Sequence, residues 1–119
     1  MKVVAECNNG RQAIDLTRQL LPDILLLDVH MPPPNGFDVA LTVSKEIPSV
    51  RIIGLSVHNH PRIVRRMMES GARGYLTKTS PLEEIHFGID EVCRGAVYIC
   101  REVMDKLSPE QVRRLQDKE

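Results

Sequence analysis

Short apolar runs alternate along the chain with longer segments in which apolar residues recur every three or four positions. Runs of about four to eight apolar residues bounded by turn formers are typical of strands that are buried on both faces of a parallel sheet. Such runs lie at Val3–Cys7, at Ile24–Leu27 leading into Asp28, at Arg51–Ser56 and, more weakly, at Gly74–Thr77. We therefore expect four strands.

The segments between these runs have the apolar spacing of amphipathic helices. They cover residues 11–20, 36–47, 61–70 and 81–94. In the last of them, Leu82, Ile85 and Ile89 share one face, Pro81 suits a first helical turn and Gly95 suits a stop. Strand and helix thus alternate throughout, which predicts an α/β domain with crossover helices packed on a parallel sheet.

Size and composition narrow the class of protein. The chain has 119 residues and 13.5 kDa, which suits one domain, and its 42% apolar and 27% charged residues are typical of a globular protein. Sixteen basic and sixteen acidic side chains give a formal charge of zero, so no overall field attracts nucleic acid or an anionic membrane. No apolar run approaches the ~20 residues of a membrane span and no secretion signal is present, so we expect a cytoplasmic protein.

Three cysteines bear on the chemistry of the chain. Cys7, Cys93 and Cys100 are an odd number and form no C-x-x-C pair. This pattern favours reduced thiols over a disulfide framework or a zinc site.

Candidate chemistry lies where the predicted strands end. Ligands of open parallel sheets bind beyond the carboxyl ends of the strands. Asp28 ends the second run, Ser56 ends the third, and Lys78 follows the fourth. A carboxylate, a hydroxyl and an ammonium group at one sheet edge are suited to accept a phosphoryl group, hydrogen-bond one of its oxygens and neutralise another.

Two motifs extend this pattern into a family resemblance. One is Leu25–Pro32, with Asp28 inside it and Gly36 eight residues after that Asp; the other is Gly71–Lys78, with Tyr75 three residues before the Lys. In this order and spacing, from about Val3 to about Val103, the chain resembles the receiver domain of bacterial two-component response regulators. It is most similar to regulators with a helix-turn-helix output. The resemblance implies a flavodoxin-like three-layer sandwich with a parallel sheet.

The resemblance also implies roles for individual residues. Asp28 would be the phosphoacceptor of a histidine kinase, Ser56 the switch hydroxyl, Lys78 the cation on the phosphoryl group and Tyr75 the aromatic that follows the hydroxyl. The backbone carbonyl of His30 would join Asp28 as a ligand of Mg²⁺. The chain would then be a phosphorelay signalling protein that carries an aspartyl phosphate and switches partner interactions, not an enzyme. It would reach DNA only through an output domain that this chain does not contain.

The chain departs from the family at its start, where the family has one more strand and helix. The missing strand carries the acidic pair that holds Mg²⁺, and neither Glu6, inside the first predicted strand, nor Asp15, on a helix, is placed to substitute. Mg²⁺ prefers about six oxygen ligands, so we expect weak or absent Mg²⁺ binding. The alternative function is therefore a receiver-like dimerisation or interaction domain that is not phosphorylated.

The missing strand also affects the architecture. In the family it lies between the strands that correspond here to Val3–Cys7 and Ile24–Asp28. Because buried backbone groups need partners, the first strand should either pair directly with the second or pair with another chain. The missing helix would leave apolar surface beside the 81–94 helix. We expect a homodimer, with strand exchange as one form, and we divide the chain into a truncated receiver domain, 1–103, and a C-terminal helix extension or linker, 104–119.

Ordinary interpretations stand beside the functional ones. Ser56 would also serve to cap the loop before Pro61, and Tyr75 would also suit a half-buried strand position. The sequence His58-Asn59-His60 lacks a third ligand and is more typical of loop histidines than of a metal site. A phosphatase-like hydrolase would need a second Asp two residues after Asp28, where His30 stands.

The 61–70 helix carries two further features. Met67 and Met68 are typical of a core or an adaptable contact face. Arg62, Arg65 and Arg66 form a basic edge on the same helix, and in receivers this helix and the strand that carries Tyr75 form a partner surface. The edge is the first candidate for an interaction face.

Overall fold

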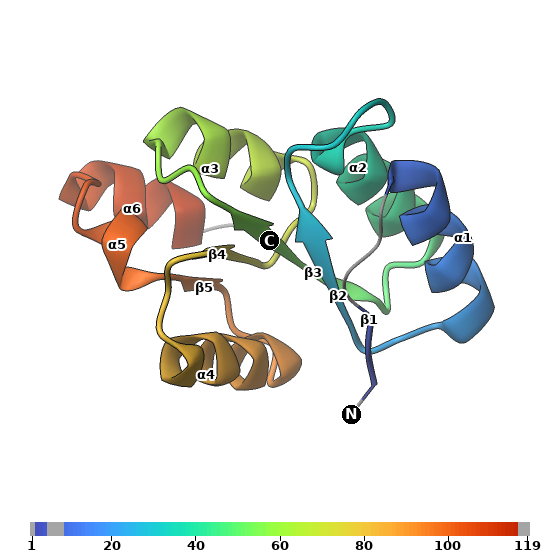
Figure 1. Ribbon diagram of the computed structural model, residues 1–119. Helices are drawn as coiled ribbons and strands as arrows, with labels where there is room; N and C mark the ends of the chain where they lie inside the picture. The colour runs from blue at the N-terminus through green and yellow to red at the C-terminus, as the bar shows by residue number, and fades with distance from the viewer. Residues whose placement is uncertain (1, 5–8, 117–119) are drawn as a thin grey trace.

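The computed structural model, which describes residues 2–4 and 9–116, confirms the alternation of strands and helices (Figure 1). The strands are β1 (Val3–Val4), β2 (Ile24–Asp28), β3 (Arg51–Ser56), β4 (Gly74–Thr77) and β5 (Tyr98–Ile99). The helices are α1 (Gly10–Leu20), α2 (Gly36–Glu46), α3 (Pro61–Glu69), α4 (Leu82–Cys93), α5 (Arg101–Met104) and α6 (Pro109–Gln116). The five strands form one parallel sheet in the order β1-β2-β3-β4-β5.

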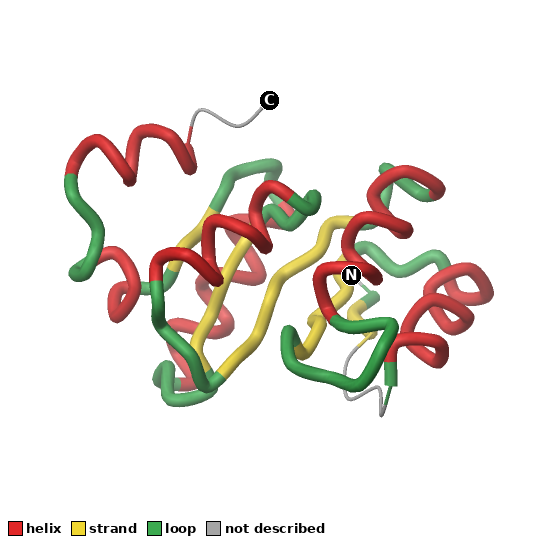
Figure 2. Tube along the Cα trace, turned by 90° about the horizontal axis from the view of Figure 1, so that it is seen from above, coloured by secondary structure: helices red, strands yellow, loops and turns green. Residues whose placement is uncertain are grey.

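Helices lie on both faces of this sheet. Helices α1, α2 and α3 form one layer and α4 lies on the opposite face, against β3, β4 and β5 (Figure 1). Figure 2 shows the strands running between the helices, with α6 at the outer end of the molecule. The three layers confirm the flavodoxin-like α/β fold that the sequence predicted.

Local sequence signals set the helix boundaries. The Asn9 side chain accepts a hydrogen bond from the Gln12 backbone N–H at 2.8 Å and starts α1. Asn35 and Asp38 form a capping box at the start of α2, with both hydrogen bonds at 3.0 Å. These side chains replace backbone partners that the first helical turn lacks. The four predicted helices accordingly begin and end within a residue or so of the observed ones.

The first strand pairs directly with the second within the same chain. Val3 is in register with Ile24 and Val4 with Leu25. Of the two arrangements expected for this edge, the structure has direct pairing. The remainder of the predicted Val3–Cys7 strand, including Glu6 and Cys7, lies outside the described residues. Strand exchange and dimerisation stay predictions.

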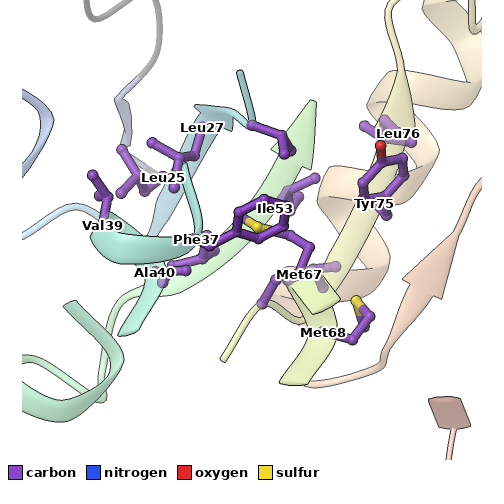
Figure 3. Close-up of a cluster of buried hydrophobic side chains, with 14 of the residues drawn as sticks. Leu25, Leu27, Phe37, Val39, Ala40, Ile53, Met67, Met68, Tyr75 and Leu76 are labelled. Atoms are coloured by element: carbon purple, nitrogen blue, oxygen red, sulfur yellow. The ribbon is translucent and has the colours of Figure 1, made fainter. Parts of the chain in front are cut away.

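One part of the core fills the space between the sheet and the layer of α1, α2 and α3. Leu25 and Leu27 of β2 lie close to Val39 of α2 in this cluster (Figure 3). Met67 and Met68 of α3 are 0% and 1% exposed, so they are core residues. Their burial agrees with the first of the two interpretations offered for them.

The α4 face of the sheet is less completely covered by described residues. A Cβ added to Gly88 of α4 would lie 3.3 Å from Leu76, and Leu76 is in register with Leu55 on the same sheet face. Several large aliphatic side chains of this face and of α4 are only half-buried: Leu26, Leu55, Ile85 and Ile89. This is the face on which the sequence predicted uncovered apolar surface.

The C-terminal part contains elements that the sequence pattern did not predict. Strand β5 has two residues, too few for an apolar run to stand out, and the proposed boundary at residue 103 falls inside α5. Residues 109–116 form the helix α6, and the division of the chain into a receiver domain and a C-terminal extension or linker stays a prediction. Within the described part of the chain, no helix has the length and apolar character needed to cross a membrane.

Candidate functional site

Three predicted site residues come to the same edge of the sheet. Asp28 is the last residue of β2, Ser56 is the last of β3, and Lys78 directly follows β4. The Lys78 backbone N–H donates to the Ser56 carbonyl at 2.7 Å, which ties the last two of these strand ends together. Parallel strands bring their carboxyl ends to one edge, as the sequence argument required.

Asp28 and Lys78 are in direct contact. The Lys78 Nζ donates to Asp28 Oδ2 at 2.8 Å, and the His30 backbone N–H donates to Asp28 Oδ1 at 3.0 Å. The Lys78 side chain is 42% exposed and the Asp28 side chain 34% exposed. An ion pair this exposed contributes about 0–1 kcal/mol to stability, so its main consequence is to hold a cation beside a reachable carboxylate.

Gly36, the first residue of α2, allows this helix to start in close contact with the backbone that follows Asp28. The Gly36 N–H donates to the Val29 carbonyl at 3.1 Å. A Cβ at Gly36 would lie 2.6 Å from Val29 Cα and 2.8 Å from the Asp28 carbonyl oxygen, closer than real Cβ contacts. The spacing of Gly36 from Asp28 therefore has a steric cause, because α2 starts against the backbone of the strand end.

Ser56 is fully buried, and its hydroxyl bonds within its own loop. Ser56 Oγ accepts a hydrogen bond from the His58 backbone N–H at 3.0 Å. This is the loop-capping arrangement that the sequence offered as the ordinary interpretation of Ser56. The next residue, Val57, is 64% exposed.

Tyr75 lies inside the molecule beneath the same loop. It is 0% exposed, and its hydroxyl donates to the His58 carbonyl at 2.8 Å. Burial raises the pKa of the Tyr75 hydroxyl, and the neighbouring Ser56 hydroxyl acts in the opposite direction. The interpretation of Tyr75 as a half-buried strand residue is therefore wrong, because the ring inserts into the core under the Ser56–His58 turn.

Two histidines stand beside Asp28 and Ser56. The rings of His30 and His58 meet edge to face, with centroids 4.3 Å apart. Burial and the neighbouring His58 lower the pKa of His30, whereas Asp28 acts to raise it. His60 instead caps α3, since its Nδ1 accepts from the Arg62 backbone N–H at 3.1 Å. The loop-histidine interpretation agrees with these contacts.

The donors in the described ranges do not fit a complete Mg²⁺ site. Among residues 2–4 and 9–116, no group of three or more His, Cys, Asp or Glu side chains is arranged to hold a metal ion. Both Asp28 oxygens already accept hydrogen bonds, and Asp15 lies on α1 near Arg18. Asp28 and the His30 carbonyl supply too few of the six or so oxygens that Mg²⁺ takes.

The structure adds a carboxylate that the sequence argument missed. Glu102 of α5 accepts hydrogen bonds from the side chains of Asn59, at 2.6 Å, and of Thr77 and Thr79, both at 2.9 Å. Its partners are 23 to 43 residues away in sequence, so no local motif predicts these hydrogen bonds. The only available signal is the pair of threonines on either side of Lys78.

Comparison with known proteins identifies the class to which this fold and site belong. A solved LuxR-family two-component response regulator from Aurantimonas sp. SI85-9A1 superposes with a TM-score of 0.83 and 27% identity, covering 92% of this chain and 78% of that one. The model of the response regulator receiver domain family matches residues 1–90. The chain belongs to the response regulator receiver domain family, whose members act in two-component signalling.

Sequence relatives agree with this assignment. The transcriptional regulatory protein DegU of Brevibacillus brevis is 30% identical over 118 residues, which are 99% of this chain and 50% of that protein. The transcriptional regulatory protein YdfI of Bacillus subtilis is 32% identical over 113 residues, 95% of this chain and 53% of that protein. The chain thus spans about half the length of the curated relatives it matches.

Proposed function

We propose that this receiver domain accepts a phosphoryl group on Asp28 from a phosphohistidine of a histidine kinase and changes its partner interactions as a result. The observation that carries the proposal is the 2.8 Å contact between Lys78 Nζ and Asp28 Oδ2 at the carboxyl edge of the sheet. A partly exposed carboxylate with a fixed cation beside it is suited to a reaction in which negative charge gathers on transferred oxygens.

The transfer itself balances without further reactants. An Asp28 carboxylate oxygen attacks phosphorus, a P–O bond forms, and the P–N bond to the kinase histidine breaks with its electron pair left on nitrogen. Lys78 shifts from the carboxylate toward a phosphoryl oxygen and neutralises part of its charge. The His30 backbone N–H, at 3.0 Å, holds the other carboxylate oxygen in place. No step is assigned to Mg²⁺, because the described donors do not fit it.

Ser56 and Tyr75 supply the proposed switch. A phosphoryl group on Asp28 would accept a hydrogen bond from the Ser56 hydroxyl, whose oxygen now accepts from the His58 N–H at 3.0 Å. Turning the hydroxyl toward the phosphoryl group would break this bond to His58. The backbone carbonyl of His58 accepts a hydrogen bond from the Tyr75 hydroxyl. Because His58 thus contacts both side chains, a rearrangement of Ser56 changes the loop that leads to α3. That loop and the basic edge of α3 form the surface on which we expect partner affinity to change.

A second candidate is an interaction domain that keeps the receiver scaffold but does not take phosphate. The lack of a fitting metal site within the described ranges favours it. In this case the Asp28–Lys78 pair would be a permanent ion pair, and the half-buried aliphatic side chains of the α4 face would pack against a second copy.

One experiment separates the two candidates. The protein is incubated with Mg²⁺ and acetyl phosphate, and separately with beryllofluoride, and the intact mass and heat of binding are measured. Phosphoryl acceptance predicts an adduct that disappears in Asp28→Asn and persists in Asp90→Asn, a change at an exposed position on α4. Absence of any adduct at millimolar donor would leave the interaction domain as the function.

The oligomeric state is tested independently of phosphate. Static light scattering at low micromolar concentration should give the mass of a dimer for the unmodified protein. A stable monomer under these conditions would contradict the predicted homodimer and, with it, strand exchange.

A further inference from the structure

Glu102 touches both loops that carry the acceptor site. One oxygen, Oε2, accepts from Asn59 Nδ2 at 2.6 Å, in the loop that follows Ser56. The other, Oε1, accepts from Thr77 Oγ1 and Thr79 Oγ1, each at 2.9 Å, in the loop that carries Lys78. A single carboxylate therefore joins the end of β3 to the end of β4 from the side of α5.

The donors on this carboxylate are neutral, and one of them is fully buried. Thr77 is 0% exposed, and its hydroxyl also meets Ser80 Oγ at 2.9 Å, so Ser80 donates to it when it donates to Glu102. Asn59, Thr79 and Thr77 together lower the pKa of Glu102. Hydrogen bonds to an ionised acceptor are about twice as strong as neutral ones, which favours one fixed geometry for the loops.

The contacts lie immediately beside the groups that would touch a phosphoryl group. Thr77 and Thr79 flank Lys78, so holding both hydroxyls fixes the backbone from which the Lys78 side chain extends toward Asp28. Asn59 follows His58, whose N–H binds Ser56 Oγ at 3.0 Å. The Glu102 carboxylate thus constrains Lys78 and the Ser56 turn without contacting Asp28.

The segment that carries Glu102 continues into the C-terminal helix. Val103, next to Glu102, is 0% exposed and anchors α5 in the core. After α5, Leu107 and Leu115 line a groove of about 440 Å³ together with Met68 of α3. Glu102 therefore lies on the segment that leads directly into α6, which faces α3 across this groove.

We propose that Glu102 is a positioning residue that holds the Lys78 and Ser56 loops and links the state of the acceptor site to the α5–α6 segment. The positioning part stands by itself, whereas the link rests on the proposed phosphoryl acceptance at Asp28. Coupling between two sites is reciprocal, so a ligand at Asp28 that moves the loops must change how firmly α5 and α6 are held.

The positioning part is tested by amide hydrogen exchange in Glu102→Ala and Glu102→Gln. We expect the Lys78 and His58 amides to exchange at least about tenfold faster in Glu102→Ala, while amides of the β2–β3 pairing keep their protection. Glu102→Gln, which keeps an oxygen acceptor, should restore part of the protection and covers the case in which the Ala variant does not fold. The control Asp105→Asn, at an exposed position on the same segment, should match the wild type.

Two results would overturn the positioning role. One is unchanged exchange at Lys78 and His58 in both Glu102 variants. The other is an equal loss of protection at all amides, which denaturant unfolding would identify as a global loss of stability.

The link is tested with beryllofluoride as the probe. In the wild type, beryllofluoride should change the exchange of residues 104–116, and in Glu102→Gln this response should be reduced and the affinity should fall by about fivefold or more. Wild-type affinity with a full response in Glu102→Gln would overturn the link. If the wild type itself binds no beryllofluoride, phosphoryl acceptance fails and the link fails with it, while the exchange experiment still decides the positioning role.

Discussion

Two carboxylates stand at the carboxyl edge of the sheet, and they differ in what surrounds them. Asp28 is paired with one cation, Lys78, and with one backbone N–H. Glu102 accepts three hydrogen bonds from neutral side chains that come from two different loops. The first carboxylate comes from a motif visible in the sequence, and the second from a tail without a motif.

The difference separates chemistry from architecture. A carboxylate whose partner is an exposed lysine can exchange that partner for a phosphoryl group at little cost, because an exposed ion pair contributes about 0–1 kcal/mol. Displacing Glu102 would remove the acceptor of three side-chain donors at once, and buried Thr77 would have to turn its hydroxyl to Ser80 Oγ at 2.9 Å. We therefore propose that Asp28 is the reactive carboxylate and Glu102 a supporting one.

The largest effect should follow removal of the cation from Asp28. Lys78→Ala should slow phosphoryl uptake from acetyl phosphate by about 100-fold to 1,000-fold, since a fixed charge on the transferred oxygens is lost. Its free energy of unfolding should change by less than about 1 kcal/mol, because the pair is exposed. Rapid-quench mass spectrometry and urea unfolding measure the two quantities.

Lys45→Ala, at an exposed position near the end of α2, is the matched control for loss of a surface lysine and should leave both quantities unchanged. Uptake by Lys78→Ala at the wild-type rate would remove the cation from the mechanism. A large loss of stability in Lys78→Ala would place Asp28 among the supporting carboxylates instead.

Gly36→Ala should disturb the Asp28 side of the edge and leave the Glu102 side intact. The new Cβ would lie 2.6 Å from Val29 Cα, so α2 or the strand end must shift, at a cost of about 1–3 kcal/mol in unfolding free energy. We expect slower phosphoryl uptake as well, because the backbone next to Asp28 moves.

Gly95→Ala is the comparison for this substitution. Gly95 has φ of 96° with no atom within 4 Å of an added Cβ, so the cost of about 1–2 kcal/mol comes from backbone strain alone. It should destabilise the protein without slowing uptake. Equal slowing by both variants would indicate that uptake follows overall stability and not the geometry at Asp28.

The sequence predicted the parts of this edge that depend on strand ends. Asp28, Ser56 and Lys78 follow apolar runs, and parallel strands must bring such positions together. The depth of Tyr75 was not predictable from its run, because burial depends on which helix covers that strand face. Glu102 was not predictable because its partners are joined only by the tertiary fold.

The elements of the fold also divide into those that local sequence patterns predict and those that they do not. Four strands and four helices followed from apolar spacing and caps, whereas β5 is too short to produce a pattern. The direct pairing of β1 with β2 was one of two arrangements that the need for backbone partners allowed. Local patterns predict elements, but the choice between partners depends on contacts distant in sequence.

The stability contributed by Glu102 should be lost in acid. Its pKa in the folded protein is lowered from the ordinary value of 4.5, mainly by the hydrogen bond from Asn59, so the unfolded chain binds the proton more readily. The contribution is therefore fully present above the unfolded pKa and disappears as the pH falls through the folded one. Urea unfolding below about pH 4.5 should show a shallower pH dependence in Glu102→Gln than in the wild type.

Glu46 provides a matched case with a different cause. Its pKa is also lowered, but by the hydrogen bond and charge of Arg18, which donates at 2.8 Å and 2.9 Å. Added salt should weaken the Glu46 contribution, because the pair is exposed, and should affect the Glu102 contribution less, because hydrogen bonds from neutral donors outweigh the charge of Lys106 there. The same salt sensitivity for both carboxylates would contradict the support that we assign to Glu102.

The smallest expected effect is a shift in the pKa of His30, which lies near Asp28 and responds to its charge. Burial and His58 hold the pKa of His30 below its ordinary value of 6.5, while Asp28 acts in the opposite direction. In an NMR titration, His58→Ala should raise the midpoint of His30 and Asp28→Asn should lower it. Shifts of the same sign in both variants would contradict this balance. Because a phosphoryl group adds negative charge where Asp28 stands, modification should raise the midpoint, so His30 distinguishes a carboxylate that has reacted from one that is only paired.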